Sequence, residues 1–181
     1  MSVKDLLVQH QEKIIDKWFT EVLNTYPEET AKFIRREKNP FANPVGAGLR
    51  AGLLGIFEQF VHGIDEKAAS GFLDGIVRVR AIQEFSPARA VGFLYGLKRL
   101  VRSELEKEMR DGAAPVEEFF DFDARVDELA LLAFNVYTSC RERLFEVKVE
   151  EIKAKSYRLL QRANLLEEFS GSEEESGIKN Q

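Results

Sequence analysis

Two histidines and one cysteine are the residues of this 181-residue chain with the best chance of holding a metal or acting as a nucleophile. His10 lies in an apolar stripe of helical spacing, where it could ligate a haem, although such residues are more often core or boundary histidines. His62 closes a predicted helix, where a cation interacts well with the helix dipole. The two do not form an i, i+4 pair and no HExxH motif is present. We therefore predict no metal site and no cofactor.

Cys140 falls in a core-facing stripe, so we expect a small buried hydrophobe and not a nucleophile. Acids cluster before the last predicted helix, at Glu117, Glu118, Asp121, Asp123 and Asp127. Paired carboxylates can do acid–base work, but acids also collect at helix starts for electrostatic reasons. The chain carries no P-loop, GxGxxG or GxSxG motif. These observations favour a protein that is not an enzyme and has no catalytic residues.

A cluster of arginines is the best candidate ligand site in the sequence, and its members are Arg78, Arg80, Arg89 and the neighbouring Ser86. Ser86 followed by a proline is a strong helix start. A helix N-terminus beside arginines is a plausible anion site. The alternative interpretation is ordinary salt bridging to acids such as Asp74 and Glu84.

The composition describes a chain with enough apolar residues for a core, at 44% hydrophobic and 31% charged. A formal net charge of −5 argues against binding nucleic acid through a broad basic surface. The N-terminus does not read as a signal peptide, and the most apolar stretch, 45–64, contains charged residues. We predict a cytoplasmic protein without a membrane segment, and an unpaired cysteine fits a reducing compartment.

Apolar spacing and breakers predict an all-α fold of about six helices, either globin-like without haem or a helical bundle. Ser2 and Asp5 resemble a capping box before the first helix. Residues 77–81 alternate like a strand, but no second strand-like run is available to pair with them, so we predict a helix there. The predicted helices cover residues 3–25, 27–37, 44–62, 72–85, 87–111 and a last helix whose stripe begins at Val126.

Several side chains are predicted to form the core, namely Trp18, Leu53, Phe57, Leu94, Leu97 and Phe134. Gly48 and Gly52 stand one turn apart on the third predicted helix. Small residues at that spacing let another helix approach closely, which offsets the roughly 1 kcal/mol that each helical glycine costs.

The last helix changes its spacing at Phe145 to an alternation of four and three, which is typical of a coiled-coil seam. The seam consists of Phe145, Val149, Ile152, Ser156, Leu159 and Ala163, and the pattern continues to Leu166. The alternative is a long helix that packs its stripe on its own domain. We predict a helical domain over residues 1–144, a coiled coil over 145–166 that pairs two chains in parallel, and a disordered acidic tail over 167–181.

Four stretches of the sequence carry a resemblance when they are taken together: Trp18–Thr30, Phe41–Gly46, Ile76–Val91, and the last helix at Ala133–Tyr137, Cys140–Glu142 and Glu150. In this order they resemble the N-terminal domain family of the RsbT co-antagonist protein RsbRD, and the likeness spans most of residues 3–155. The resemblance implies a bacterial sensory input domain that looks like a globin without haem, dimerises and passes a signal along its C-terminal helix. Such domains often continue into an output domain, such as a STAS domain or a kinase. The sequence ends after the seam and an acidic stretch, so we expect a stand-alone regulator or a trimmed form.

We hypothesise a non-enzymatic regulatory domain in which a ligand or protein partner shifts helix packing and so biases the dimer seam. We expect a homodimer with a regulatory protein partner, and no contact with nucleic acid or membrane. The alternatives are a haem or small-molecule sensor with His10 or His62 as ligand, a structural adaptor and, least supported, an enzyme.

Overall fold

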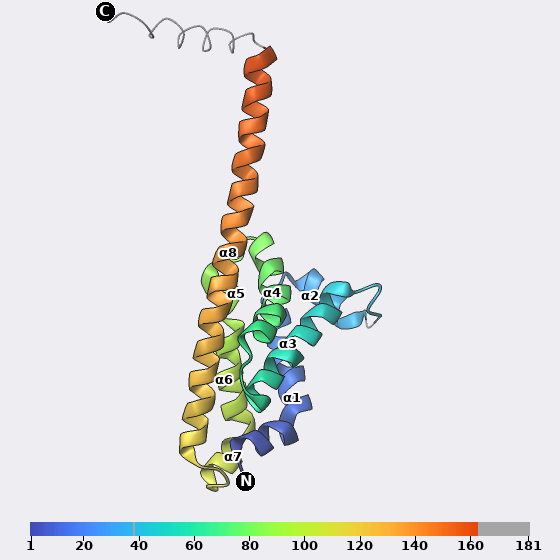
Figure 1. Ribbon diagram of the computed structural model, residues 1–181. Coiled ribbons are helices and arrows are strands. Elements are labelled where there is room, and N and C mark those ends of the chain that lie inside the picture. Colours follow the sequence, from blue (N-terminus) through green and yellow to red (C-terminus); the bar gives the residue numbers. More distant parts are fainter. Residues whose placement is uncertain (38, 163–181) are drawn as a thin grey trace, which may run out of the picture. The chain divides into compact units, whose positions relative to one another are not determined.

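The computed structural model describes residues 1–37 and 39–162 and places eight helices and no strand in that part of the chain (Figure 1). The prediction of an all-α fold is confirmed. The helices are α1 (Val3–Leu23), α2 (Glu28–Arg36), α3 (Pro44–His62), α4 (Glu66–Ile82), α5 (Pro87–Val91), α6 (Phe93–Glu104), α7 (Glu106–Arg110) and α8 (Val116–Arg162). Because α5 and α7 have only five residues each, six longer helices remain, as expected.

The chain divides into two units, Met1–Arg141 and the part from Glu142 onward, and each is described by itself. In the first unit α1 packs against α3 and α6, and α3 packs against α4 (Figure 1). In the second unit the described residues continue α8 to Arg162. Ala163 and the predicted tail lie outside the described residues. The boundary after residue 144 stays a prediction.

Side-chain caps determine where α1 and α3 begin. The Ser2 hydroxyl accepts a hydrogen bond from the Asp5 amide at 3.1 Å, and the Asp5 carboxylate accepts from the Ser2 amide at 2.9 Å. This reciprocal pair is the predicted capping box, and it satisfies two amides that have no partner within the helix. The Asn43 side chain caps α3 by accepting from the Gly46 amide at 2.9 Å.

The helix predicted over 72–85 is present, but α4 begins six residues earlier and ends at Ile82, three residues before the predicted end. The Asp65 carboxylate caps α4 by accepting from the Ala68 amide at 2.8 Å. An aspartate whose side chain accepts a hydrogen bond from the amide three residues later is a common helix N-cap. The apolar spacing alone did not indicate this start.

The single helix predicted over residues 87–111 is wrong, because the structure interrupts it after Val91 and after Glu104. At the first break the Gly92 amide donates to the Ala88 carbonyl at 2.8 Å, and a Cβ on Gly92 would lie 2.6 Å from that oxygen. At the second break Leu105 leaves the helical region, with φ −104° and ψ 15°. Neither break is marked by a proline, and the apolar stripe runs through both. The sequence therefore predicted one continuous helix.

Helices α3 and α4 approach closely at glycines, although only one of the two predicted glycines takes part. A Cβ on Gly52 would lie 3.0 Å from Ile76 Cδ1, whereas one on Gly48 would meet nothing within 4 Å. Gly55, which the sequence analysis did not single out, is in the tighter contact, because a Cβ there would lie 2.5 Å from the Phe72 ring.

Trp18 occupies the centre of the first unit and is fully buried. Its indole N–H donates to the Phe93 carbonyl at 2.8 Å, and the two rings stack at 5.9 Å between centroids. The hydrogen bond satisfies the one polar atom that burial of a tryptophan would otherwise leave without a partner. Leu53, Phe57 and two α6 leucines are also fully buried, as predicted, and these leucines are Leu94 and Leu97.

The prediction that Phe134 belongs to the core is wrong, because its side chain is 49% exposed. The buried face of α8 carries Val126, Ala130, Ala133 and Tyr137. Phe134 follows Ala133 directly and is therefore turned by about 100° from that face.

Candidate functional site

Arg80, one of the predicted anion-binding residues, is fully buried. Its Nη1 donates to the Arg89 carbonyl at 3.0 Å and to the Ala90 carbonyl at 3.3 Å, and its Nη2 donates to Thr25 Oγ1 at 3.1 Å. No carboxylate in the described part of the chain lies within salt-bridge distance of it. Burial lowers the pKa of Arg80, since the surroundings disfavour the charged form.

Aromatic rings take the place of an acid around this guanidinium group. The Arg80 Cζ lies 5.5 Å from the Tyr26 ring centroid, 5.4 Å from that of Phe85 and 5.0 Å from that of Phe93. Ring faces attract a cation, and the attraction grows when water is excluded. Arg80 belongs to α4, and its contacts link this helix to the segment after α1, to α5 and to the start of α6.

The other residues of the predicted anion site are exposed and already have partners within the protein. Arg78 forms an ion pair with Asp74 at 2.9 Å, which raises the pKa of this arginine. Arg89 Nη2 donates to the Thr25 carbonyl at 2.8 Å, and Ser86 Oγ accepts from the Arg89 amide at 3.4 Å. The interpretation of salt bridging therefore holds for Arg78, and anion binding by this cluster stays a prediction.

The two histidines lie apart on different helices. His10 of α1 is half-buried, with Nε2 3.5 Å from Glu108 Oε1, and His62 is exposed, with Nε2 3.0 Å from Glu58 Oε2. Cys140 is half-buried at the edge of the core. Among the described residues no group of three histidine, cysteine or acidic side chains is placed to hold a metal ion.

Three of the acids at the start of α8, namely Glu118, Asp123 and Asp127, take separate partners. Glu118 Oε2 accepts from the Val3 amide at 2.7 Å. Asp127 pairs with Lys98 at 2.8 Å, and Asp123 pairs with Arg102. These contacts join α8 to α1 and α6, so their visible role is to hold the first unit together.

Glu104, which the sequence analysis did not single out, is a nearly buried carboxylate whose side chain is 3% exposed. Lys13 lies 2.5 Å from it and Lys17 forms a second ion pair with it. Hydrogen bonds from these two lysines lower the pKa of Glu104 below its ordinary value. The signal in the sequence was weak, since the lysines lie four residues apart on α1 and the acid lies on α6.

The predicted seam residues in the second unit are largely exposed in the single chain. Phe145 is 69% exposed, Ile152 63% and Leu159 65%, and these three are spaced by seven residues. Val149 is half-exposed and Ser156 is exposed. Pairing of these residues between two chains stays a prediction.

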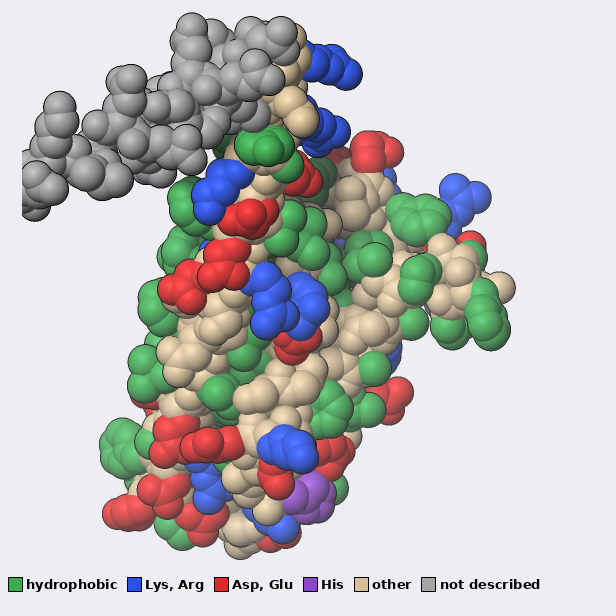
Figure 2. Space-filling model, turned by 45° about the horizontal axis from the view of Figure 1, so that its top comes forward, with side chains coloured by type: hydrophobic (Ala, Val, Ile, Leu, Met, Phe, Trp, Pro, Cys, Tyr) green, Lys and Arg blue, Asp and Glu red, His purple; other side chains and the backbone are tan. Residues whose placement is uncertain are grey.

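Further apolar side chains are exposed in the first unit. On α8 they are Val116, Phe120, Leu131 and Phe134. The loop between α2 and α3 also carries hydrophobic side chains at its surface (Figure 2), and Phe41 in it is 96% exposed.

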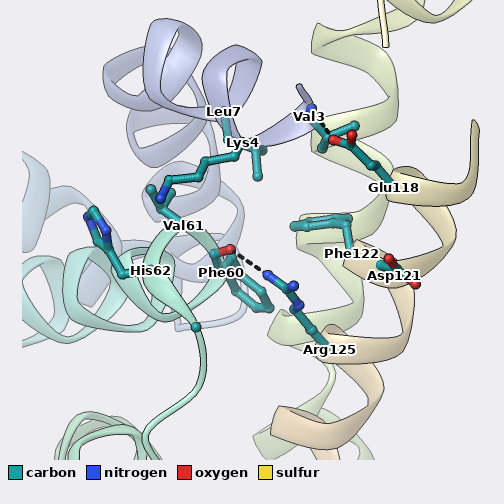
Figure 3. A pocket seen from close by; sticks show the side chains of 11 residues that line it. Val3, Lys4, Leu7, Phe60, Val61, His62, Glu118, Asp121, Phe122 and Arg125 are labelled. Atoms are coloured by element: carbon teal, nitrogen blue, oxygen red, sulfur yellow. Dashed lines mark hydrogen bonds between the residues drawn. The ribbon is translucent and has the colours of Figure 1, made fainter. Parts of the chain in front are cut away.

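A cleft of about 340 Å³ lies where α1 begins, α3 ends and α8 begins (Figure 3). Its apolar wall includes Phe60 and Phe122, whose ring centroids lie 5.3 Å apart. Lys4 and Arg125 line it as cations, and Arg125 Nη1 donates to the Phe60 carbonyl at 3.1 Å. The sequence analysis missed this cleft because its residues come from three distant segments with no common motif.

Comparison with known protein families gives a match over most of the chain. The family model described as RsbT co-antagonist protein rsbRD N-terminal domain matches residues 12–152. Neither a curated protein nor a solved structure matches the chain. No helix in the described part of the chain is long and apolar enough to span a membrane.

Proposed function

The chain belongs to the RsbT co-antagonist protein rsbRD N-terminal domain family, and from this premise we propose that it dimerises through α8 and transmits a signal along that helix. The family is regulatory and generally non-catalytic, which agrees with the absence of a catalytic motif in the sequence. The proposal adds two finer statements: the active form is a homodimer, and a ligand or protein partner changes helix packing in the first unit.

The observation that carries the proposal is the exposure of large apolar side chains at heptad spacing. Phe145, Ile152 and Leu159 are each more than 60% exposed in the single chain. Pairing two such helices would remove these side chains from water, which contributes roughly 25 cal/mol for each Å² of apolar surface buried. Charged flanking residues, such as Glu146 and Lys153, suit the borders of a two-stranded seam.

The exposed apolar residues nearer the start of α8 support the same arrangement. Phe134 precedes Phe145 by eleven residues, which is about three helical turns, and Leu131 precedes it by about four. Residues at such spacings share one side of a regular helix. We propose that Leu131 and Phe134, which are exposed in the first unit, also take part in the contact between two chains.

A substitution on the seam tests the dimer directly. Ile152→Asp places a charge at a seam position, and Val147→Asp is the matched control, because Val147 is 53% exposed but lies off the seam. Sedimentation equilibrium of the full chain should show a dimer for the parent and for Val147→Asp, and at least tenfold weaker association for Ile152→Asp. A monomeric parent, or equal dissociation constants for the two variants, would refute the seam. Removal of the residues after Leu144 should also weaken the dimer.

A regulatory protein partner is the second element of the proposal. The family description points to an antagonist role toward another protein, which implies a protein contact. Co-purification of the full chain with a candidate partner, compared with the Ile152→Asp variant, would show whether binding requires the dimer. The haem alternative is tested by a visible absorption spectrum of the purified chain, in which a Soret band would favour His10 or His62 as ligand.

A further inference from the structure

We propose that the cleft between α1, α3 and α8 binds a small organic anion, with its carboxylate at Lys4 and Arg125 and its apolar body on Phe60 and Phe122. This inference rests on the proposed function, because the bound molecule would be the signal that the domain senses. The cleft, at about 340 Å³, is at the lower end of the 300–1,000 Å³ range that small-molecule sites occupy.

The two cations of the cleft, Lys4 and Arg125, form no salt bridge with the described residues, although two acids also line the cleft. Arg125 donates one Nη1 hydrogen bond to the Phe60 carbonyl, and no carboxylate of the described residues lies within salt-bridge distance of it. The same holds for Lys4, whereas Lys13 and Lys17, farther along α1, are paired with Glu104. Two cations that line one cleft without a salt bridge are placed to receive an anion.

Figure 3 shows that both cationic side chains reach toward the end of α3. Arg125 extends from α8 toward the end of α3, while the Lys4 side chain extends from α1 toward Val61 and His62. The guanidinium group keeps further N–H donors beyond the one that Phe60 accepts, and a carboxylate can take two of them at once.

Two carboxylates also line the cleft, and one of them is already engaged. Glu118 accepts a hydrogen bond from the Val3 amide at 2.7 Å, at the positive end of α1. Asp121 is exposed and has no ion pair among the described residues. A ligand with an ammonium group could therefore contact Asp121, so the test compares ligands of opposite charge.

The apolar residues of the cleft indicate the shape and polarity of the part of the ligand beyond its carboxylate. The Phe60 and Phe122 rings meet at 55°, and both side chains are almost fully buried, as are Val3 and Leu7 beside them. A flat or short apolar group would therefore meet only the exposed edges of this wall, with its carboxylate at the charged rim. Phenylacetate has this form and a suitable size.

A ligand in the cleft would contact α8 directly, because Glu118, Phe122 and Arg125 all belong to this helix. If the first turns of α8 can pack in two arrangements, a ligand that binds one arrangement more tightly raises the fraction of molecules in that arrangement.

The test uses three probes with the same ring: phenylacetate, 2-phenylethanol and phenethylammonium. Binding is followed in the full chain by the backbone amide signals of Lys4, Gly63 and Arg125 in NMR titrations. We expect saturable shifts with phenylacetate, and at least tenfold weaker binding of the alcohol and the ammonium compound. Arg125→Gln and Lys4→Gln should each weaken phenylacetate binding about tenfold. Lys67→Gln, an exposed lysine outside the cleft, should have no effect.

Three results would overturn the inference: no saturable shift with phenylacetate, equal or tighter binding of the ammonium compound, or equal affinity in Lys4→Gln and Lys67→Gln. Because Arg125 also contacts Phe60, Lys4→Gln on the exposed surface decides the matter if Arg125→Gln perturbs the fold. Sedimentation of the ligand-free chain tests the dimer separately, so a monomer that binds phenylacetate refutes the proposed function alone, and a dimer that does not bind refutes the cleft alone.

Discussion

Replacement of Gly55 by alanine should stabilise the protein only when the Phe72 ring is absent. Alanine is favoured over glycine inside a helix by about 1 kcal/mol. In the parent, however, the new Cβ would lie 2.5 Å from the Phe72 ring, which is too close for two carbon atoms. Overpacking of this kind costs about 1–3 kcal/mol, so Gly55→Ala should leave the free energy of unfolding unchanged or lower it by up to about 2 kcal/mol.

Removal of the ring reverses the effect. In a Phe72→Ala background the space beside Gly55 opens, and Gly55→Ala should then raise the free energy of unfolding by about 1 kcal/mol. The cycle therefore predicts a coupling of about 1–3 kcal/mol between the two positions. Gly48→Ala is the internal control, because its Cβ would meet nothing within 4 Å, and it should stabilise both backgrounds by about 1 kcal/mol.

The assay is urea-induced unfolding followed by circular dichroism at one fixed protein concentration, since a dimer would make apparent stability depend on concentration. The reasoning fails if Gly55→Ala stabilises the parent as much as Gly48→Ala does. It also fails if the two effects of Gly55→Ala agree within error in the presence and absence of Phe72.

Three further predictions concern individual side chains. Arg80→Lys should lower the free energy of unfolding by about 2 kcal/mol in urea titrations, because lysine cannot reproduce the planar fork, whereas Arg78→Lys on the surface should change it by less than about 0.5 kcal/mol. Because the pKa of Glu104 is lowered, its ion pairs stabilise the fold above pH 4.5 and this contribution is lost as the pH falls below that value. Glu104→Gln should therefore be less stable than the parent at pH 7, with a difference that shrinks toward pH 3. Phe134→Ser should alter unfolding by less than about 0.5 kcal/mol in dilute solution but weaken the dimer in sedimentation, and the reverse pattern would place Phe134 in the core.

Local signals in the sequence correctly predicted the starts of α1, α3 and α5. The Ser2 cap, the Asn43–Pro44 start of α3 and the Ser86 cap all depend on contacts within three or four residues. Such contacts can be recognised from spacing alone. The same holds for the buried position of Trp18, which lies in the middle of a regular apolar stripe.

Features that depend on distant segments could not be predicted in this way. Arg80 was predicted to line an anion site, but it is buried among carbonyl groups of α5 and rings from three other segments. Phe134 looked like a core residue, but its neighbour Ala133 takes the buried position. The cleft at Lys4 and Arg125 is assembled from residues more than a hundred positions apart, and no local pattern marks it.

The burial of Trp18 gives the protein a built-in optical reporter. The sequence contains one tryptophan, so all the indole fluorescence comes from a ring stacked on Phe93 between α1 and α6. Its emission should be blue-shifted in the folded chain and move to the red when α6 separates from α1. A change of packing in the first unit can therefore be timed in a stopped-flow instrument without any attached dye, and the rate compared with that of dimer formation.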